Sequence, residues 1–187
     1  MRTKLTLFIL MLCALGSAYS QSTLSVEESI ISLQAGLFGG WISYEKQLKP
    51  TTTLKAEIGL DNGVWSNGSN TGFYFVPAFI AEPRWYYGLK KRIAKEKDVS
   101  GNSANYLSLF LRHHPDWFIL SNENIGRVTP DLSIIPTWGI HRKLSSHFSF
   151  ETSVGIGYRL YFVENTTSSS NYGEMDFNLT VRIGYDF

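Results

Sequence analysis

The sequence has almost no cysteine and no long hydrophobic run after its first twenty residues. Its one cysteine is Cys13, so the remainder of the chain has no thiol available for a disulfide framework. No later segment approaches the roughly 18 apolar residues that a spanning helix needs, which excludes a helical membrane protein. Phosphate loops, zinc-ligand spacings and redox motifs are also missing from the sequence. We therefore expect no cofactor and no bound metal.

A surplus of charge is missing as well. The 17 Lys and Arg residues nearly balance the 16 Asp and Glu residues. A chain that binds nucleic acid usually carries a basic face, so we expect no nucleic-acid partner. The length fits one small domain, and it also fits eight strands of roughly 9–11 residues each.

The first twenty residues have the layout of a secretory signal peptide. Arg2 and Lys4 form a basic start, Leu5 to Leu15 carry no charge, and Ala18 and Ser20 are small residues at the positions that precede a cleavage site. The bulky residue before Cys13 argues against a lipid anchor. We therefore expect residues 1–20 to be removed and residues 21–187 to form one domain.

The rest of the chain alternates between apolar and polar residues, which is the pattern of strands with one apolar face. The clearest case is Phe177–Phe187, where every second residue is large and apolar. The alternation predicts seven strands, in these segments: Leu33–Leu48, Leu54–Leu60, Phe73–Tyr87, Leu107–Leu111, Leu132–Leu144, Phe148–Phe162 and Phe177–Phe187. A closed barrel normally has an even number of strands. We expect the eighth within Thr23–Ser32 or from a different division near Gly39-Gly40.

Three features favour a membrane barrel over a soluble one. The apolar faces are too bulky to fit inside a small barrel. Aromatic residues gather at the strand ends, as at membrane interfaces. The polar faces contain glycines, which make room in a crowded interior. We therefore predict a single antiparallel up-and-down transmembrane β-barrel of eight strands, with a polar lumen filled by side chains.

Charged residues on the polar faces are expected to form ion pairs that plug this lumen, because unpaired charges are costly in a partly dry interior. Both signs occur in similar number. The expected interior residues are Lys55, Glu57, Asp61, Glu82, Arg84, Arg112, His141, Lys143, Glu151, Arg159, Arg182 and Asp186. A narrow solute path is the alternative, although open conduction needs more strands.

The connections have two kinds of length and composition. Lys49–Thr52 and Lys143–Ser146 are predicted to be tight turns, whereas Ser66–Thr71 and Val163–Gly173 are longer and polar. Outer-membrane barrels combine short periplasmic turns with long outside loops. The exception is Gly88–Ser103, which is long and basic. It is predicted to be a solvated turn or, alternatively, to include a short helix against inner-leaflet phosphates.

Prolines interrupt several predicted strands. Pro77, Pro83 and Pro136 lack the N–H that a closed barrel uses in its ladders. We expect bulges at these prolines, or pairing that starts late.

The chain resembles the small outer-membrane β-barrel proteins of Gram-negative bacteria, and in particular an uncharacterised group of Bacteroidota. The similar segments are Glu82–Tyr87 with Leu89–Arg92, Asn105–Leu109 and Ile134–Gly139. The resemblance implies export, location in the outer membrane and contact with its lipids. It also implies that the barrel-assembly machinery reads the ending Tyr185-Asp186-Phe187. It implies no activity.

Two histidine-containing groups are candidates for chemistry. His147, Ser149 and Glu151 alternate on one strand and could in principle activate a nucleophile. His113 and His114 are adjacent and should point to opposite faces of a strand, which makes a poor metal pair. We therefore predict no catalytic, cofactor-binding or metal-binding residue.

The expected function is non-catalytic, in envelope structure or in binding of an extracellular ligand through the loops. The candidate surfaces are Ser66–Thr71, Pro115–Pro130 and Val163–Gly173. The second contains the apolar residues Trp117, Phe118 and Ile119, which indicate a contact surface or a strand that extends above the bilayer. The alternatives are a lipid-modifying enzyme of the outer membrane and a secreted soluble barrel that carries a lipid.

Overall fold

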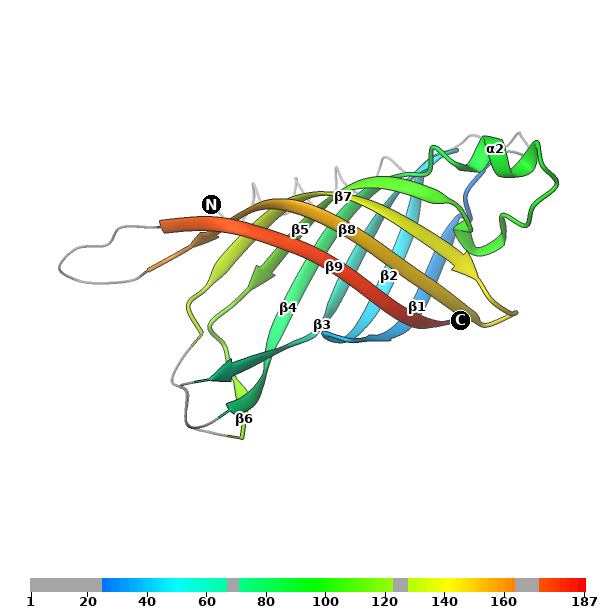
Figure 1. The fold of residues 1–187 in the computed structure, drawn as a ribbon. Coiled ribbons are helices and arrows are strands. Elements are labelled where there is room, and N and C mark those ends of the chain that lie inside the picture. Colours follow the sequence, from blue (N-terminus) through cyan, green and yellow to red (C-terminus); the bar gives the residue numbers. More distant parts are fainter. Residues whose placement is uncertain (1–24, 67–70, 123–127, 164–171) are drawn as a thin grey trace, which may run out of the picture.

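The computed structural model describes residues 25–66, 71–122, 128–163 and 172–187 (Figure 1). The expected signal peptide and the central parts of the three candidate loops lie outside these residues. The described elements, in chain order, are β1 (Ser29–Gly36), β2 (Gly39–Lys49), β3 (Thr52–Ser66), β4 (Thr71–Trp85), the helix α2 (Leu89–Ile93), the 3₁₀ turn η1 (Ser100–Asn102), β5 (Asn105–His114), β6 (Leu120–Ser121), β7 (Asp131–Lys143), β8 (Phe148–Tyr161) and β9 (Tyr172–Asp186).

Eight strands close into a barrel. Each pairs antiparallel with its neighbours in the order β1, β2, β3, β4, β5, β7, β8 and β9, and β9 returns to pair with β1. The two-residue strand β6 lies outside this ring and adds to β4. The predicted eight-stranded antiparallel barrel is therefore confirmed. None of the described helices has the length and apolar character needed to cross a membrane.

The eighth strand comes from the region of the predicted strand Leu33–Leu48, whose register was ambiguous in the sequence. The predicted strand Leu33–Leu48 is in fact two strands, β1 and β2, joined by a two-residue turn at Leu37 and Phe38. β1 begins at Ser29, inside the segment proposed to hide a strand. Both expectations for the missing strand are therefore met in part.

The barrel has two unlike ends (Figure 1). α2 and the C-terminal end of β9 lie at one end, which we call the α2 end. The paired strand ends Ser66–Thr71 of β3 and β4 and Tyr161–Tyr172 of β8 and β9 lie at the other, which we call the hairpin end. As predicted, the connections after β2 and β7 at the α2 end are short, and only Pro50 and Thr51 separate Lys49 of β2 from Thr52 of β3.

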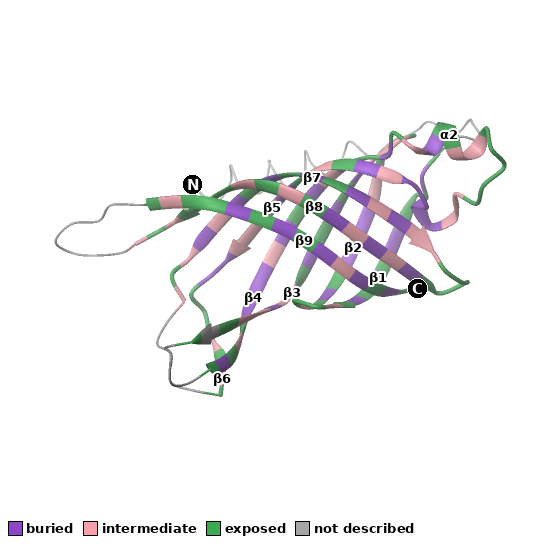
Figure 2. Cartoon of the chain, in the orientation of Figure 1, coloured by how far each residue is buried: buried purple, intermediate pink, exposed green. Residues whose placement is uncertain are grey.

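Buried and exposed residues alternate along the strands (Figure 2), and the buried ones are mostly polar whereas the exposed ones are mostly apolar. On β9 the exposed fraction of Ile183 is 56%, whereas that of its neighbour Arg182 is 6%. On β8, Val154 and Ile156 are exposed in the same way, and Glu151 is buried. This inside-out distribution was the central expectation from the alternation, and it is confirmed.

The prolines are accommodated without bulges in the described ladders. Pairing of β4 with β5 starts only at Phe79, past Pro77, as one of the two expectations required. Pro83 and Pro136 each pair on one side, with Leu54 and Leu109. On the other side the ladder skips them and resumes in the same register. The expected bulges at these two positions were wrong, because a missing N–H can be tolerated by leaving a gap on one side of the strand.

The segment between β4 and β5 closes the α2 end. Leu89, the first residue of α2, is fully buried and packs in a cluster with Val26, Tyr86, Ala104 and Tyr106. A short helix was one of the two expectations here. The helix α2 is present and its first residue packs on the barrel, whereas the expected contact with inner-leaflet phosphates stays a prediction. The cations Lys90 and Lys91 remain exposed.

Candidate functional site

The centre of the barrel is filled by an ion-pair network. We define the central network as Lys55, Glu57, Glu82, Arg84, Glu151 and Arg182, all of them nearly inaccessible to solvent. Arg84 binds two carboxylates: its Nε donates to Glu82 at 2.8 Å and its Nη2 donates to Glu151 Oε1 at 2.7 Å. Arg182 Nη1 donates to Glu57 Oε2 at 2.7 Å. The predicted plug of paired charges is thus present.

The network crosses the barrel from wall to wall. Lys55 Nζ on β3 lies 2.6 Å from Glu57 and 3.2 Å from Glu151 on β8. Gln34 on β1 accepts a hydrogen bond from Lys55 as well as one from Arg182. Because each charge has partners from more than one strand, the cost of burying it is offset by several charge-assisted hydrogen bonds.

A second polar layer, which was not predicted from the sequence, lies between the central network and the α2 end. Glu45 on β2 accepts hydrogen bonds from Thr53, Tyr86 and Asn102, at 2.7–3.0 Å. Burial raises the pKa of the Tyr86 phenol well above its usual range, so Tyr86 remains a neutral donor to this carboxylate. Glu45 lies in the predicted strand Leu33–Leu48, whose register was ambiguous. If the turn at Leu37–Phe38 had been recognised, the alternation of β2 would have assigned Glu45 to the barrel interior.

An apolar layer separates the central network from the hairpin end. It consists of Trp41, Ile80, Phe110 and Ile135, all buried. Trp41 connects this layer to a charged residue on the side of the hairpin end, because its Nε1 donates to Asp61 at 2.8 Å. Inward-facing apolar residues were not expected from the alternation, because they occupy the polar side of their strands.

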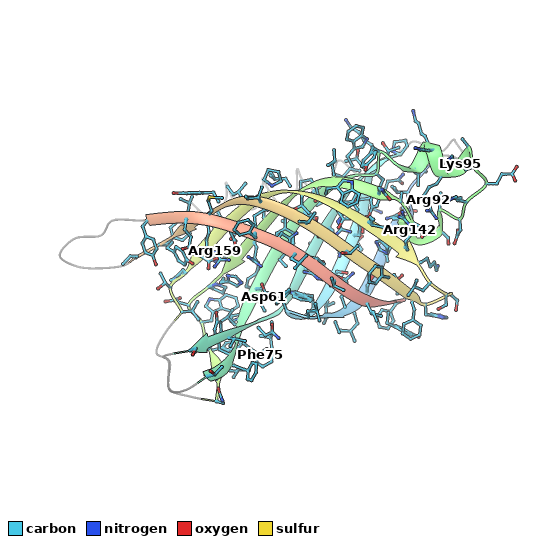
Figure 3. The ribbon with its side chains drawn as sticks, in the orientation of Figure 1. Asp61, Phe75, Arg92, Lys95, Arg142 and Arg159 are labelled. Carbon is cyan, nitrogen blue, oxygen red and sulfur yellow. The ribbon has the colours of Figure 1, made fainter. Side chains whose placement is uncertain are left out.

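The hairpin half contains a second group of charges, which we call the hairpin-end cluster: Asp61, Arg112, His114, Asp131, Arg159 and Asp176. Asp176 on β9 accepts from Arg159 at 2.9 Å, from Arg112 at 3.0 Å and from Ser133 at 2.6 Å. His114 lies between Asp61 and Asp131, with nitrogen–oxygen distances of 3.1 and 2.9 Å. Figure 3 shows Asp61 and Arg159 in this half of the barrel, far from Arg92 and Arg142 at the α2 end.

A cavity of about 220 Å³ lies beside the hairpin-end cluster. Its inner wall includes Arg112, Asp176 and Trp41. Its outer rim is apolar and includes Leu37 and Leu179. This cavity joins charged groups and exposed apolar side chains within one space, which makes it the best candidate for a binding site among the described residues.

Most of the predicted interior residues lie where the alternation placed them. Arg112 and Arg159 are half-buried in the hairpin-end cluster, and Asp186 is buried and accepts from Ser32 and Ser149. Lys143 is the exception. It ends β7 at the α2 end, half-buried, with its backbone N–H donating to Ser103. His114, Asp131 and Asp176 were missed, although extending the alternation of β5, β7 and β9 by one step would have found them.

The two histidine candidates are not assembled into sites. His147 is exposed and stacks on Tyr185, Ser149 Oγ donates to Asp186 at 3.0 Å, and Glu151 is held by Arg84 and Lys55. The three residues therefore have separate partners. His113 Nδ1 lies 2.6 Å from the carbonyl oxygen of Asp131, whereas His114 points inward, so the pair is split across the barrel wall as expected.

The apolar candidate surface folds back on the outside of the barrel. β5 ends at His114 and β6 starts at Leu120, so Trp117 and Phe118 lie between strands, and both are exposed. Trp117 packs edge-on against Phe79 of β4, with ring centroids 5.2 Å apart. The remaining candidate surfaces, Ser66–Thr71 and Val163–Gly173, lie mainly outside the described residues. No protein-family model, no curated protein and no solved structure matches this chain.

Proposed function

We propose that this chain is an integral β-barrel protein of a bacterial outer membrane, closed to free passage and acting by binding rather than by catalysis. The observation that carries the proposal is the inversion of burial along each strand. Large apolar side chains cover the outside of the barrel and ionised ones fill the inside. In water this outer surface would be an apolar patch far larger than a soluble monomer exposes, whereas in a bilayer it is the required lipid-facing band.

Closure of the ring supports the same proposal. A sheet can cross hydrocarbon only when its strands leave no open edge, and here β9 returns to β1. Aromatic side chains at the α2 end, among them Trp85, Tyr87 and Tyr185, are exposed. Trp138 Nε1 donates to Tyr87 Oη at 2.7 Å. Rings with a polar atom favour the headgroup depth of a membrane. A soluble barrel that carries a lipid is disfavoured, because it would need its apolar residues inside.

The proposed lack of a conducting path rests on the central network. Arg84, Lys55 and Glu151 fill the cross-section from β3, β4 and β8 with paired groups, and the layer around Glu45 and Leu89 lies below them. A solute would have to break these pairs in order to pass. Binding at the hairpin end remains open to the protein, because the charges there line a cavity.

The membrane proposal is tested by electrophoresis of the purified chain in detergent with and without boiling. We expect a heat-dependent change in mobility, and extraction of the native protein from cells only by detergent. In planar bilayers we expect no steady conductance. Lipid A from cells with and without the protein should have the same mass profile. Recovery of the chain as a detergent-free soluble monomer would contradict the proposal.

A further inference from the structure

The positive charges without an ion-pair partner are gathered at one end of the barrel. In the central network and the hairpin-end cluster, every lysine and arginine pairs with a carboxylate, and the exposed Lys46 pairs with Glu28. Among the described residues, the cations that form no ion pair lie in the segment 90–97 and at Lys49, Arg142 and Lys143. All of them belong to strand ends or connections at the α2 end. We call the segment 90–97 together with Arg142 and Lys143 the basic surface.

Acidic residues do not neutralise the basic surface. The segment 90–97 has five lysines and arginines and one acidic residue, Glu96. Asp98 follows, but its carboxylate accepts from the backbone N–H of Ser100 at 2.8 Å and from the hydroxyl of the same residue at 2.9 Å. Arg92 donates to the carbonyl oxygen of Asp98 rather than to its carboxylate. An excess of positive charge therefore remains at the α2 end.

Two arginines of the basic surface are fixed by neutral oxygens. Arg92 is held by the carbonyl group of Asp98, and Arg142 donates to the carbonyl oxygen of His141 and to the side-chain oxygen of Asn105, both at 2.6 Å. Figure 3 shows Arg92 and Arg142 at the same end of the barrel, and their positive charges repel each other. An anion beside the two guanidinium groups relieves this repulsion, and their planar sets of donors match the oxygens of a phosphate.

The position of Arg142 on the outer face of β7 indicates the depth of the basic surface. Trp138, Ile140 and Arg142 share the outward face of this strand, so the cation comes directly after the apolar residues. Trp138 Nε1 donates to Tyr87 Oη at 2.7 Å, and α2 begins two residues after Tyr87. Rings with a polar atom favour the headgroup depth of a membrane. Cations directly beyond these rings are at the level of lipid phosphates, which favours a lipid surface over a soluble partner.

The segment that carries most of these cations is anchored on the barrel. Leu89 is buried in the cluster with Tyr86 and Tyr106, and Ile93 and Val99 pack against the same cluster. The side-chain oxygen of Asn102 accepts from the backbone N–H of Glu27 at 2.7 Å. A segment that is already ordered loses little conformational entropy when it binds a ligand.

We propose that the basic surface binds the phosphate groups of anionic phospholipids in the leaflet around the α2 end, with Arg92 and Arg142 at its centre. A phospholipid with a net negative charge neutralises the surface, whereas a zwitterionic phospholipid brings a cation of its own. Each lysine or arginine near a membrane surface contributes about fivefold to the affinity for anionic lipid. The inference rests on the proposed membrane location and adds a preference for one class of lipid at one end of the barrel.

The test measures the lipid preference of the purified chain in nanodiscs of phosphatidylglycerol and phosphatidylcholine with identical acyl chains. In one series the chains of phosphatidylglycerol are brominated, and in the other those of phosphatidylcholine. Bromine quenches the fluorescence of nearby tryptophans, and the exposed Trp85 and Trp138 at the α2 end report lipid that is bound there. We expect stronger quenching by phosphatidylglycerol at equal mole fraction, and a preference that falls as salt is added.

Three variants make the test specific. Arg92→Gln and Arg142→Gln each remove one charge and keep a hydrogen-bond donor, and each should lower the preference for phosphatidylglycerol about fivefold. Lys46→Gln removes an exposed cation at the same end of the barrel that Glu28 already neutralises, and it should change the preference less than about twofold. The heat-dependent change in electrophoretic mobility shows that each variant is folded.

The outcomes separate the lipid preference from the membrane location. Equal quenching by the two brominated lipids would overturn the lipid preference and leave the membrane barrel intact. A preference that persists when Arg92 and Arg142 are both replaced by Gln would place the anionic lipid elsewhere on the barrel, and would also overturn the proposal. Absence of quenching by either lipid would contradict the membrane location itself.

Soluble anions are compared in the same nanodiscs. Loss of the preference on addition of inorganic phosphate, beyond the effect of sodium chloride at the same ionic strength, would assign the basic surface to free phosphate. Binding of polyglutamate to the protein in phosphatidylcholine nanodiscs, together with equal quenching by the two lipids, would assign it to a soluble acidic polymer. Either result would overturn the proposal.

Discussion

The guanidinium carbon of Arg182 lies 3.7 Å from the centroid of the Trp41 ring, in the middle of the barrel. Arg182 belongs to the central network through Glu57, and Trp41 belongs to the hairpin-end charges through Asp61. The contact therefore couples the central network to the hairpin-end cluster through the apolar layer to which Trp41 belongs. Cation–π pairs that are shielded from water contribute about 2 kcal/mol or more.

Removing the Trp41 ring should destabilise the barrel strongly. Trp41→Ala takes away the contact with Arg182 and the hydrogen bond to Asp61, and it leaves a cavity, so we expect a loss of about 3–5 kcal/mol in the free energy of unfolding. Urea denaturation in vesicles measures it. Leu179→Ala, on the outer surface, is the control and should change little in a bilayer. Equal effects of the two changes would contradict the inward position of Trp41.

Arg84 should be the least replaceable charge of the central network. Arg84→Met leaves the carboxylates of Glu82 and Glu151 without their main partner, and removal of one member of a buried pair typically costs about 3–5 kcal/mol. The matched change Lys46→Met breaks the exposed pair with Glu28 and should cost about 1 kcal/mol or less. The unfolding midpoints of the two variants provide the comparison. A small effect of Arg84→Met would mean that the network is hydrated and open.

Gly139 provides the space for Tyr106. A Cβ at Gly139 would lie 2.3 Å from the Tyr106 ring, and Arg84 lies 4.3 Å from the centroid of that ring on the inside. Gly139→Ala should therefore cost about 1–3 kcal/mol through overpacking. In the background Tyr106→Leu, the same glycine change should cost much less. A double-mutant cycle on unfolding free energies tests this coupling, and additive effects would refute the steric explanation.

Leu89 should matter for stability through its contacts with the barrel. Leu89→Ala removes a fully buried side chain from the cluster with Tyr86 and Tyr106, and we expect a loss of about 2–5 kcal/mol. Lys90→Ala, one residue along the same helix and exposed, should be nearly neutral. The temperature at which the heat-dependent gel shift occurs measures both effects. A larger loss for Lys90→Ala than for Leu89→Ala would mean that α2 acts through its exposed face, as a surface helix.

The sequence predicts the parts of the fold in which one face is uniformly apolar. β8 and β9 follow from alternation and β7 follows from it except at Ile135; the register is fixed because a shift of one residue would reverse every side chain. The division between β1 and β2 could not be located, since Leu37 and Phe38 are not turn formers and continue the apolar pattern. A short helix within Gly88–Ser103 was one of two alternatives, and the packing of Leu89 could not be predicted because its partners Val26 and Ala104 are distant in sequence.

The interior charges were predicted and the candidate site was not. Alternation assigns Arg112 and Arg159 to the inside, but it cannot show that the hairpin-end charges border a cavity. That cavity depends on the unequal heights of the β1–β2, β3–β4 and β8–β9 hairpins. The distance that a hairpin extends along the barrel axis depends on the position of its turn relative to those of the neighbouring hairpins. The alternation pattern of a single strand does not contain this position.

The long sequence separation between Glu151 and its cationic partners has a consequence for the assembly of the barrel. Its carboxylate binds Arg84, 67 residues away in the chain, and Lys55, 96 residues away. A partly assembled sheet that lacked β8 would have an open edge and would leave each cation with only the carboxylate on its own strand, Glu82 for Arg84 and Glu57 for Lys55. In the proposed bilayer, an open sheet edge beside partly paired charges would be costly. Insertion and closure should therefore occur as one event, after the last strands have been synthesised.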